Sequence, residues 1–169
     1  MTTETIDMTA FDIDGTELKT AGLRPEGWYR AEIRKLTPRT IEYNDKETGE
    51  PKSFPIINVL LKLTHQADYN DQGEYQGTSE LAFSANAFSD FGNGGGGLLR
   101  LKNAYKAIVG SLPSGNTNAM ALAEELQGQS MWVRIFHSEN SDTGDIREKV
   151  ASTFRSLDYG PPASVTVRQ

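Results

Sequence analysis

Residues 27–34 alternate strictly between apolar and polar or charged positions, and this alternation constrains the fold more than any other feature. Successive side chains of a β-strand point to opposite faces of a sheet, so the pattern predicts a strand. Tyr29, Ala31 and Ile33 form its apolar face. The other face carries Trp28, Arg30, Glu32 and Arg34. A tryptophan between charged residues is unusual for a face that only meets water.

The same pattern returns about a hundred residues later, at residues 130–136. Met131, Val133 and Ile135 alternate there with Trp132, Arg134 and Phe136. Two strands therefore carry the motif Trp-x-Arg on the face opposite their core residues. If the strands are neighbours in one sheet, they form an aromatic and cationic platform. Single-stranded nucleic acid binds such surfaces, because rings stack on bases and guanidinium groups contact phosphates.

The composition indicates one globular domain. The chain has 169 residues, of which 37% are hydrophobic and 24% charged, which fits a single folded unit. No apolar run reaches the roughly 18 to 20 residues of a membrane helix, and no secretory signal is recognised. The absence of cysteine excludes disulfides, thiolate zinc sites and cysteine nucleophiles. These features favour a cytoplasmic protein.

The charge is unevenly distributed. Residues 1–20 contain five acids and one base, a net charge of −4, and the remainder holds 18 acids and 16 bases, a net charge of −2. Residues 1–24 are therefore expected to form an acidic, flexible arm, with a short edge strand around Phe11 and Ile13 as an alternative. An acidic arm could also compete with nucleic acid for a basic face.

The order of the remaining elements is expected to be three strands, two helices and two strands. The strands are predicted at residues 27–36, 54–64, 78–83, 130–136 and 149–157, and the helices at residues 98–109 and 119–126. Long polar connections follow the first and fourth strands. Ile41 and Tyr43 could extend the first connection into a hairpin arm. Pro161 and Pro162 end the predicted domain, and residues 159–169 are expected to be a mobile tail.

This order is that of an OB-fold, a five-stranded, partly open barrel with a helix between its third and fourth strands. The predicted class is mainly β, with residues 25–158 as the OB-fold domain and a short second helix. In this fold the first and fourth strands are neighbours, as the platform requires. The first helix is expected to plug the barrel with a stripe of Leu98, Leu101, Tyr105 and Ile108.

Several short motifs resemble those of a phage single-stranded-DNA-binding protein family. They are Gly-Trp-Tyr-Arg-Ala-Glu-Ile at residues 27–33, the apolar second strand, and Leu-Gln-Gly at residues 126–128 leading into Met-Trp-Val-Arg-Ile at residues 131–135. The resemblance covers about residues 27–157. It implies an OB-fold and a role in DNA replication or recombination of a phage, in the host cytoplasm. Many such proteins end in an acidic tail with a terminal aromatic residue, which residues 164–169 lack.

The candidate nucleic-acid-binding residues are rings that could stack on bases and cations that could contact phosphates. They are Trp28, Arg30, Arg34, Trp132, Arg134, Phe136, Tyr43, Lys46, Lys52, Arg147 and Lys149. In the alternative interpretation the tryptophans are partly buried beneath a loop or at a dimer interface. The arginines would then form surface ion pairs, which contribute little to stability.

Catalytic and metal-binding patterns are not recognised. Glu139, Asp142 and Asp145 do not match a calcium loop, and the two histidines, His65 and His137, lack the spacing of a zinc pair. No nucleophile elbow or His-Glu-x-x-His motif occurs. We therefore expect no cofactor, no metal and no enzymatic activity.

Two functions remain open. The first is a non-catalytic protein that coats single-stranded DNA, alone or as a homo-oligomer, alongside phage replication or recombination proteins. The second is a phage protein that uses the same scaffold to bind a host or phage protein. The net charge of −6 favours the second function, and the doubled Trp-x-Arg motif favours the first.

Overall fold

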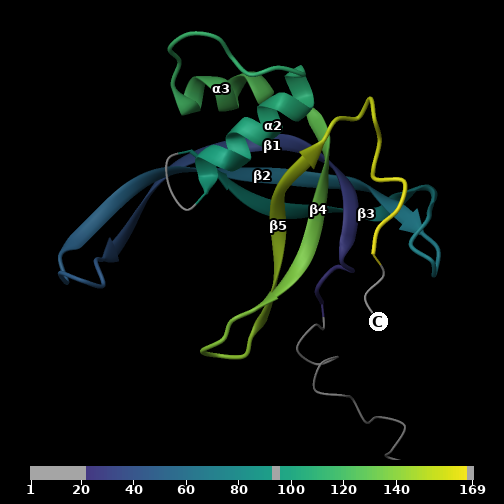
Figure 1. Ribbon diagram of the computed structural model, residues 1–169, viewed down its shortest axis with the longest axis horizontal. Helices are drawn as coiled ribbons and strands as arrows, with labels where there is room; N and C mark the ends of the chain where they lie inside the picture. Colours follow the sequence, from purple (N-terminus) through teal and green to yellow (C-terminus); the bar gives the residue numbers. More distant parts are fainter. Residues whose placement is uncertain (1–21, 93–95, 167–169) are drawn as a thin grey trace, which may run out of the picture.

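The computed structural model describes residues 22–92 and 96–166. Five strands form one antiparallel sheet in the order β3-β2-β1-β4-β5. The strands are β1 (Gly27–Asn44), β2 (Pro51–Tyr69), β3 (Tyr75–Phe91), β4 (Ser130–Glu139) and β5 (Ile146–Arg155). Two helices, α2 (Gly97–Val109) and α3 (Ala119–Leu126), lie between β3 and β4 in the chain (Figure 1). The class is therefore mainly β, as predicted.

Strand β1 is the centre of the sheet, because it pairs with β2 along one edge and with β4 along the other. The predicted neighbourhood of the two Trp-x-Arg strands is confirmed. Beyond the paired part of β4, Ile33 and residues 128–129 exchange two backbone hydrogen bonds, Gly128 N to Ile33 O at 2.7 Å and Ile33 N to Gln129 O at 2.9 Å. The left-handed φ of +85° at Gly128 turns the chain into β4 after α3.

The main core lies between the sheet and the two helices, which cover one of its faces (Figure 1). The predicted apolar face of β1 is buried here, with Tyr29, Ala31 and Ile33 each at most 1% exposed. Its partners on β4 are Met131, Val133 and Ile135. The two outer strands also meet, because the rings of Phe91 on β3 and Phe154 on β5 pack edge to face with centroids 6.3 Å apart. The sheet is thus strongly curled around this core.

Helix α2 fits the predicted stripe except at its first position. Leu101 and Tyr105 are buried and Ile108 packs against the core, but Leu98 is 58% exposed. Leu98 lies in the first turn of the helix and is not part of the core cluster. The end of α2 is as predicted, since Gly110 caps it in the left-handed conformation and donates to Lys106 O.

Strands β1, β2 and β4 extend beyond their predicted bounds and form two hairpin arms with β5 (Figure 1). Strand β5 begins three residues before its predicted start and ends two residues before its predicted end. Ile41 and Tyr43 do lie on the first arm, where they pair with Phe54 and Lys52. The residues of the arms are mostly polar, so the sequence showed no alternation of apolar residues that would predict strands there. Backbone pairing does not require an apolar face, however, and the ladder hydrogen bonds continue without one.

The two arms end in the same turn, a repeat that the sequence analysis did not identify. In the first arm, Asp45 Oδ1 accepts from the backbone N–H groups of Glu47 and Thr48, and Gly49 N donates to Asp45 O. In the second arm, Asn140 makes the same bonds with Asp142, Thr143 and Gly144. The shared pattern is Asx-x-acid-Thr-Gly-acid. A side chain that accepts two residues onward is a typical turn former.

Both ends of the described chain pack against the sheet. Arg24, in the predicted N-terminal arm, donates from its backbone N–H and its Nε to Glu148 at 2.9 and 3.2 Å, and its carbonyl accepts from His137 Nε2 at 2.6 Å. Residues 161–166, from the predicted mobile tail, lie beside the start of β3. The remaining predictions for the acidic arm fall on residues 1–21, outside the described residues.

Replacing Leu101 by alanine should test the core packing of α2. The side chain is 1% exposed, and Leu→Ala at such positions costs about 2–5 kcal/mol because a cavity remains. Leu98→Ala, on the same helix, should cost well under about 1 kcal/mol, since the side chain is already in water. Urea unfolding measures both. Equal losses for the two variants would contradict this packing.

Candidate nucleic-acid interface

The two Trp-x-Arg motifs form a checkerboard on the sheet face opposite the main core. In the register of β1 and β4, Trp28 is opposite Arg134, and Arg30 is opposite Trp132. Residues directly opposite in a sheet point to the same side. Each tryptophan therefore has an arginine across the strand pair, and each arginine has a tryptophan. The juxtaposition that the sequence predicted is present.

The indole rings, however, are covered. Trp28 and Trp132 are 7% and 6% exposed and form a second buried cluster with Ala67 of β2. Tyr69, Tyr75 and Val165 pack against this cluster. The rings are therefore not an open platform, because side chains of β2, β3 and the segment after β5 pack against them. In this respect the structure matches the alternative interpretation of tryptophans beneath a loop.

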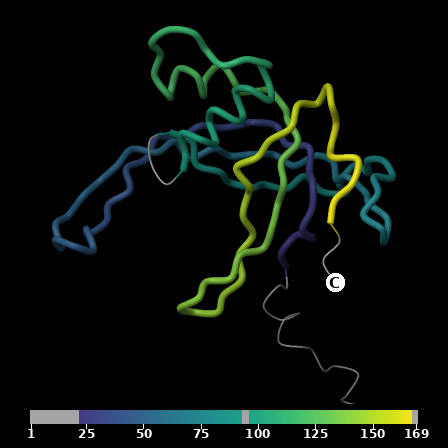
Figure 2. Tube along the Cα trace, viewed as in Figure 1, coloured from purple at the N-terminus to yellow at the C-terminus, as the bar shows by residue number. Residues whose placement is uncertain are grey.

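One part of this cover is the segment 161–166, called the strap below, which contributes Val165. Tyr75 N donates to Ala163 O at 2.9 Å, and Val165 N donates to Gly73 O at 2.8 Å, on either side of an isolated bridge between Glu74 and Ser164. Figure 2 shows the strap running beside the turn between β2 and β3. Tyr69 fixes the start of the strap, because its hydroxyl donates to Pro162 O at 2.7 Å.

A groove of about 760 Å³ lies between part of the strap and the sheet. Its walls include Trp28, Tyr69, Arg134, Pro162 and Val165. The indole of Trp28, the phenol of Tyr69 and the guanidinium group of Arg134 thus line the same groove.

The arginines differ in how far they are engaged. Arg30 and Arg134 are exposed on the outer face. Arg34 lies at a register irregularity of β1, where its guanidinium pairs with Glu32 at 3.1 Å. Arg155 was not among the predicted residues, although it is opposite Trp132 on β5 and donates from Nε to Gly160 O at 3.0 Å. It helps to hold the chain at the start of the strap.

The second arm brings three predicted residues onto one face. Phe136 of β4 is opposite Lys149 of β5, and Ser138 is opposite Arg147. Lys149 and Arg147 are exposed, and Phe136 is partly buried. These side chains continue the outer face beyond Arg134.

The predicted residues of the first arm lie far from the checkerboard in the register. Tyr43 is 46% exposed and packs against Phe54, with ring centroids 5.7 Å apart. Lys52 forms an ion pair with Asp45 at 2.7 Å and holds the pKa of that carboxyl below its usual value. Lys46 lies in the turn between Asp45 and Glu47. Each lysine of this arm therefore has carboxylates close in sequence, which weakens its attraction for phosphates.

The structure adds residues that the sequence reasoning missed. Lys62 of β2 is opposite Glu32 on β1 and Asn86 on β3. One pair further along, Leu60 of β2 lies between Lys35 of β1 and Phe88 of β3. Phe88 is 60% exposed and Lys35 is exposed. Lys62 could have been found from the sequence, because it is a lysine within the apolar second strand. Phe88 could not, because it lies outside the third strand as predicted, at residues 78–83.

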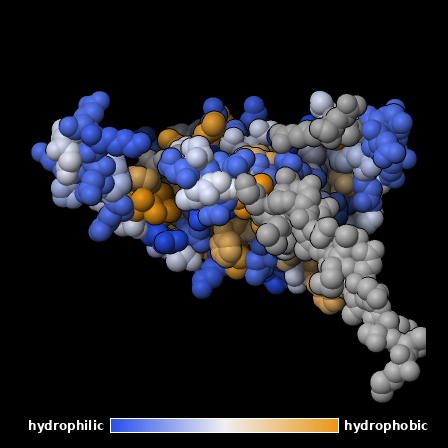
Figure 3. All heavy atoms as spheres, turned by 90° about the horizontal axis from the view of Figure 1, so that it is seen from below, coloured by the Kyte–Doolittle hydropathy of each residue, from blue (hydrophilic) through white to orange (hydrophobic). Residues whose placement is uncertain are grey.

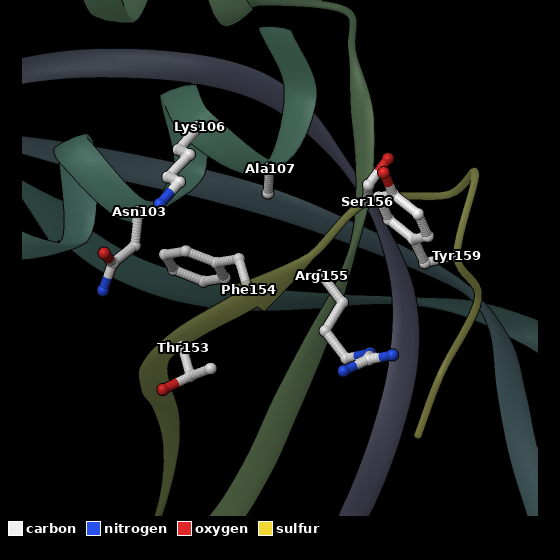
Figure 4. Close-up of a pocket in the computed structure, with 8 residues that line it drawn as sticks. All are labelled: Asn103, Lys106, Ala107, Thr153, Phe154, Arg155, Ser156 and Tyr159. Atoms are coloured by element: carbon white, nitrogen blue, oxygen red, sulfur yellow. The ribbon is translucent and has the colours of Figure 1, made fainter. Parts of the chain in front are cut away.

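A second groove, of about 610 Å³, lies between α2 and the end of β5. Figure 4 shows Lys106 and Asn103 beside the ring of Phe154, with Ser156 and Tyr159 on the other side. Leu98, Leu99 and Val109 of α2 are each at least half exposed. This groove lies on the helix side of the molecule.

Within residues 22–92 and 96–166, no group of three or more acidic, histidine or cysteine residues could hold a metal ion. No helix in this part of the chain is long and apolar enough to cross a membrane. Compared with known proteins, the chain matches no protein-family model. A search of curated proteins also finds no significant match.

The strap contact predicts an alkaline loss of stability. Burial raises the pKa of Tyr69 to about 12, from 10.0 for a free tyrosine. The folded protein thus keeps this proton at a pH where the unfolded chain releases it, so the free energy of unfolding should fall as pH rises from about 10 towards 12. Tyr69→Phe should make this fall less steep, in urea unfolding followed at several pH values. Tyr159→Phe, which alters an exposed ring, is the control. An equal slope in wild type and Tyr69→Phe would count against the buried phenol.

Proposed function

We propose that the chain is a non-catalytic single-stranded-DNA-binding protein built on an OB-fold. The observation that carries this proposal is one sheet face with cations from three adjacent strands. Arg134 of β4, Arg30 and Lys35 of β1, and Lys62 of β2 all point to the face opposite the main core. A single strand that crosses the sheet would meet them in turn, and its phosphates would be neutralised along the way.

The strand order supports the OB-fold. In that fold the first strand pairs with the second and the fourth, and a helix lies between the third and fourth strands. Here β1 pairs with β2 and β4, and α2 follows β3. The contact between Phe91 and Phe154 brings the two outer strands together, as a closing barrel requires.

Aromatic stacking in the free protein would begin at Phe88 rather than at the tryptophans. Phe88 is 60% exposed, beside Leu60 and close to Lys35 and Lys62 on the same face. An exposed aromatic ring can stack on any of the bases, because every base has a flat aromatic face. The outer face of the second and third strands is also where OB-folds bind oligonucleotides. The proposal therefore describes binding with little sequence preference, in replication or recombination of a phage and in the host cytoplasm.

The second candidate is a protein partner, and the exposed apolar residues of α2 favour it. Leu98, Leu99 and Val109 are on the helix side, away from the cations of the outer sheet face. Figure 3, seen from the side away from the helices, shows hydrophilic residues at both ends of the molecule, where the β1–β2 and β2–β3 turns lie. Ionic strength separates the two functions, because DNA binding weakens steeply with salt.

Arginine substitutions should lower the salt dependence of binding. Arg30→Ala and Arg134→Ala should each reduce the slope of log K against log salt by about 0.7, the value for one phosphate of a single strand. Fluorescence anisotropy of a labelled oligo-dT measures the slope. Lys102→Ala removes an exposed cation of α2, on the other side of the sheet, and should leave the slope unchanged. If the arginine variants keep the wild-type slope, these residues are not on the phosphate path.

Phe88 should discriminate single strands from duplex. Phe88→Ala should weaken oligo-dT binding by about 1–3 kcal/mol, the value of one stacked base, and should change duplex binding much less, because paired bases hide their faces. The control is Tyr159→Ala, which removes another exposed ring, beside α2. Competition between labelled single strands and unlabelled duplex gives both affinities. Equal losses on both substrates would exclude stacking at Phe88.

A further inference from the structure

The strap is attached to the sheet by few bonds. It forms a single bridge, between Glu74 and Ser164, with one backbone hydrogen bond on each side. Pro161 and Pro162, which precede the bridge, have no backbone N–H to donate. The backbone pairing of the strap therefore cannot continue in the N-terminal direction. Ala163, Ser164 and Thr166 are exposed, whereas the start of the strap is anchored by the buried Pro161 and by the hydrogen bond from Tyr69 to Pro162. Segments with few buried contacts and short ladders open at lower free energy than the core.

The surface under the strap has the composition of a base-stacking site. Two indoles lie there, and Arg30 and Arg134 lie exposed beside them. The groove already leaves open space between the strap and Arg134. The phosphate partners are thus accessible in the closed form, whereas the stacking partners are covered.

We infer that the strap and single-stranded nucleic acid compete for the surface of Trp28 and Trp132. Opening of the strap would expose the indoles to water, so the closed form dominates in the free protein. Bases that stack on the indoles replace the cover and stabilise the open form. This inference rests on the proposed function. Besides the exposed ring of Phe88, the protein would have a second site for bases at the two indoles. This second site is available only when residues 161–166 move away.

A reversible lock can test the competition. The hydrogen bonds flanking Glu74 and Ser164 make them a non-hydrogen-bonded antiparallel pair, for which the Cα atoms are about 4.5 Å apart. That separation lies within the range of disulfides, about 4.4–6.8 Å. The double variant Glu74→Cys, Ser164→Cys should therefore lock the strap when oxidised and release it when reduced. Both residues are exposed, and the natural chain has no cysteine, so wild type treated with the same oxidant is a clean control.

Two readouts are needed. Anisotropy of a labelled oligo-dT reports binding anywhere on the protein, and quenching of the intrinsic tryptophan fluorescence reports bases on the indoles. The reduced variant should bind like wild type, with quenching. The oxidised variant should bind about tenfold to hundredfold more weakly, the equivalent of roughly one stacked base, and without quenching. Val165→Ser, which removes an apolar side chain packed on the cluster, should act in the opposite direction and tighten binding.

The results distinguish this inference from the proposed function. If the oxidised and reduced forms bind with equal affinity and equal quenching, the strap does not compete, while the proposed function stands. Binding without quenching in the reduced form would also overturn the hidden site. If neither form binds the oligonucleotide by anisotropy, both the proposed function and this inference are wrong.

Discussion

The structure depends on the position of β1 between β2 and β4. A strand with partners on both edges has its backbone groups satisfied by the sheet, and both of its faces are then free to meet other parts of the chain. On one face, Tyr29, Ala31 and Ile33 meet the helices; on the other, Trp28 meets Trp132 and Ala67. This burial on both faces explains why one β-strand, β1, contributes to both the main core and the surface that we propose for nucleic acid.

Much of the sheet could be predicted from the sequence, because alternation reports directly which side chains are buried. The helix at residues 119–126 and the pairing of the two Trp-x-Arg strands were predicted correctly. The first arm was predicted only as a possible extension at Ile41 and Tyr43, because neighbours such as Thr40 and Glu42 are exposed and pair through their backbones. The second arm was not predicted. Strand β3 was predicted too short for a related reason. Its register is irregular between Glu80 and Ala85, which breaks the alternation.

The candidate site was predictable only in part. Periodicity placed Trp28, Arg30, Trp132 and Arg134 on one face, but no local pattern shows what covers that face. The strap, which is part of this cover, is held by hydrogen bonds between Tyr75 and Ala163 and between Val165 and Gly73, which are some ninety residues apart in the chain. Pro161 and Pro162 were predicted to end the folded domain. In the structure they carry the chain back across the sheet, with Pro162 accepting from Tyr69.

The pairing of β1 with β4 has a consequence for how the chain is made. About 95 residues separate the end of β1, at Asn44, from the end of β4, at Glu139. Ribosomes add about 5–20 residues per second. Strand β4 is therefore complete only roughly 5 to 20 s after β1, and until then the β1 edge that carries Trp28 is unpaired. During that time the nascent meander of β1, β2 and β3 has an open edge next to an uncovered indole. Unpaired edges of this kind favour aggregation, so we expect the growing chain to be more prone to aggregate before β4 is made than after it.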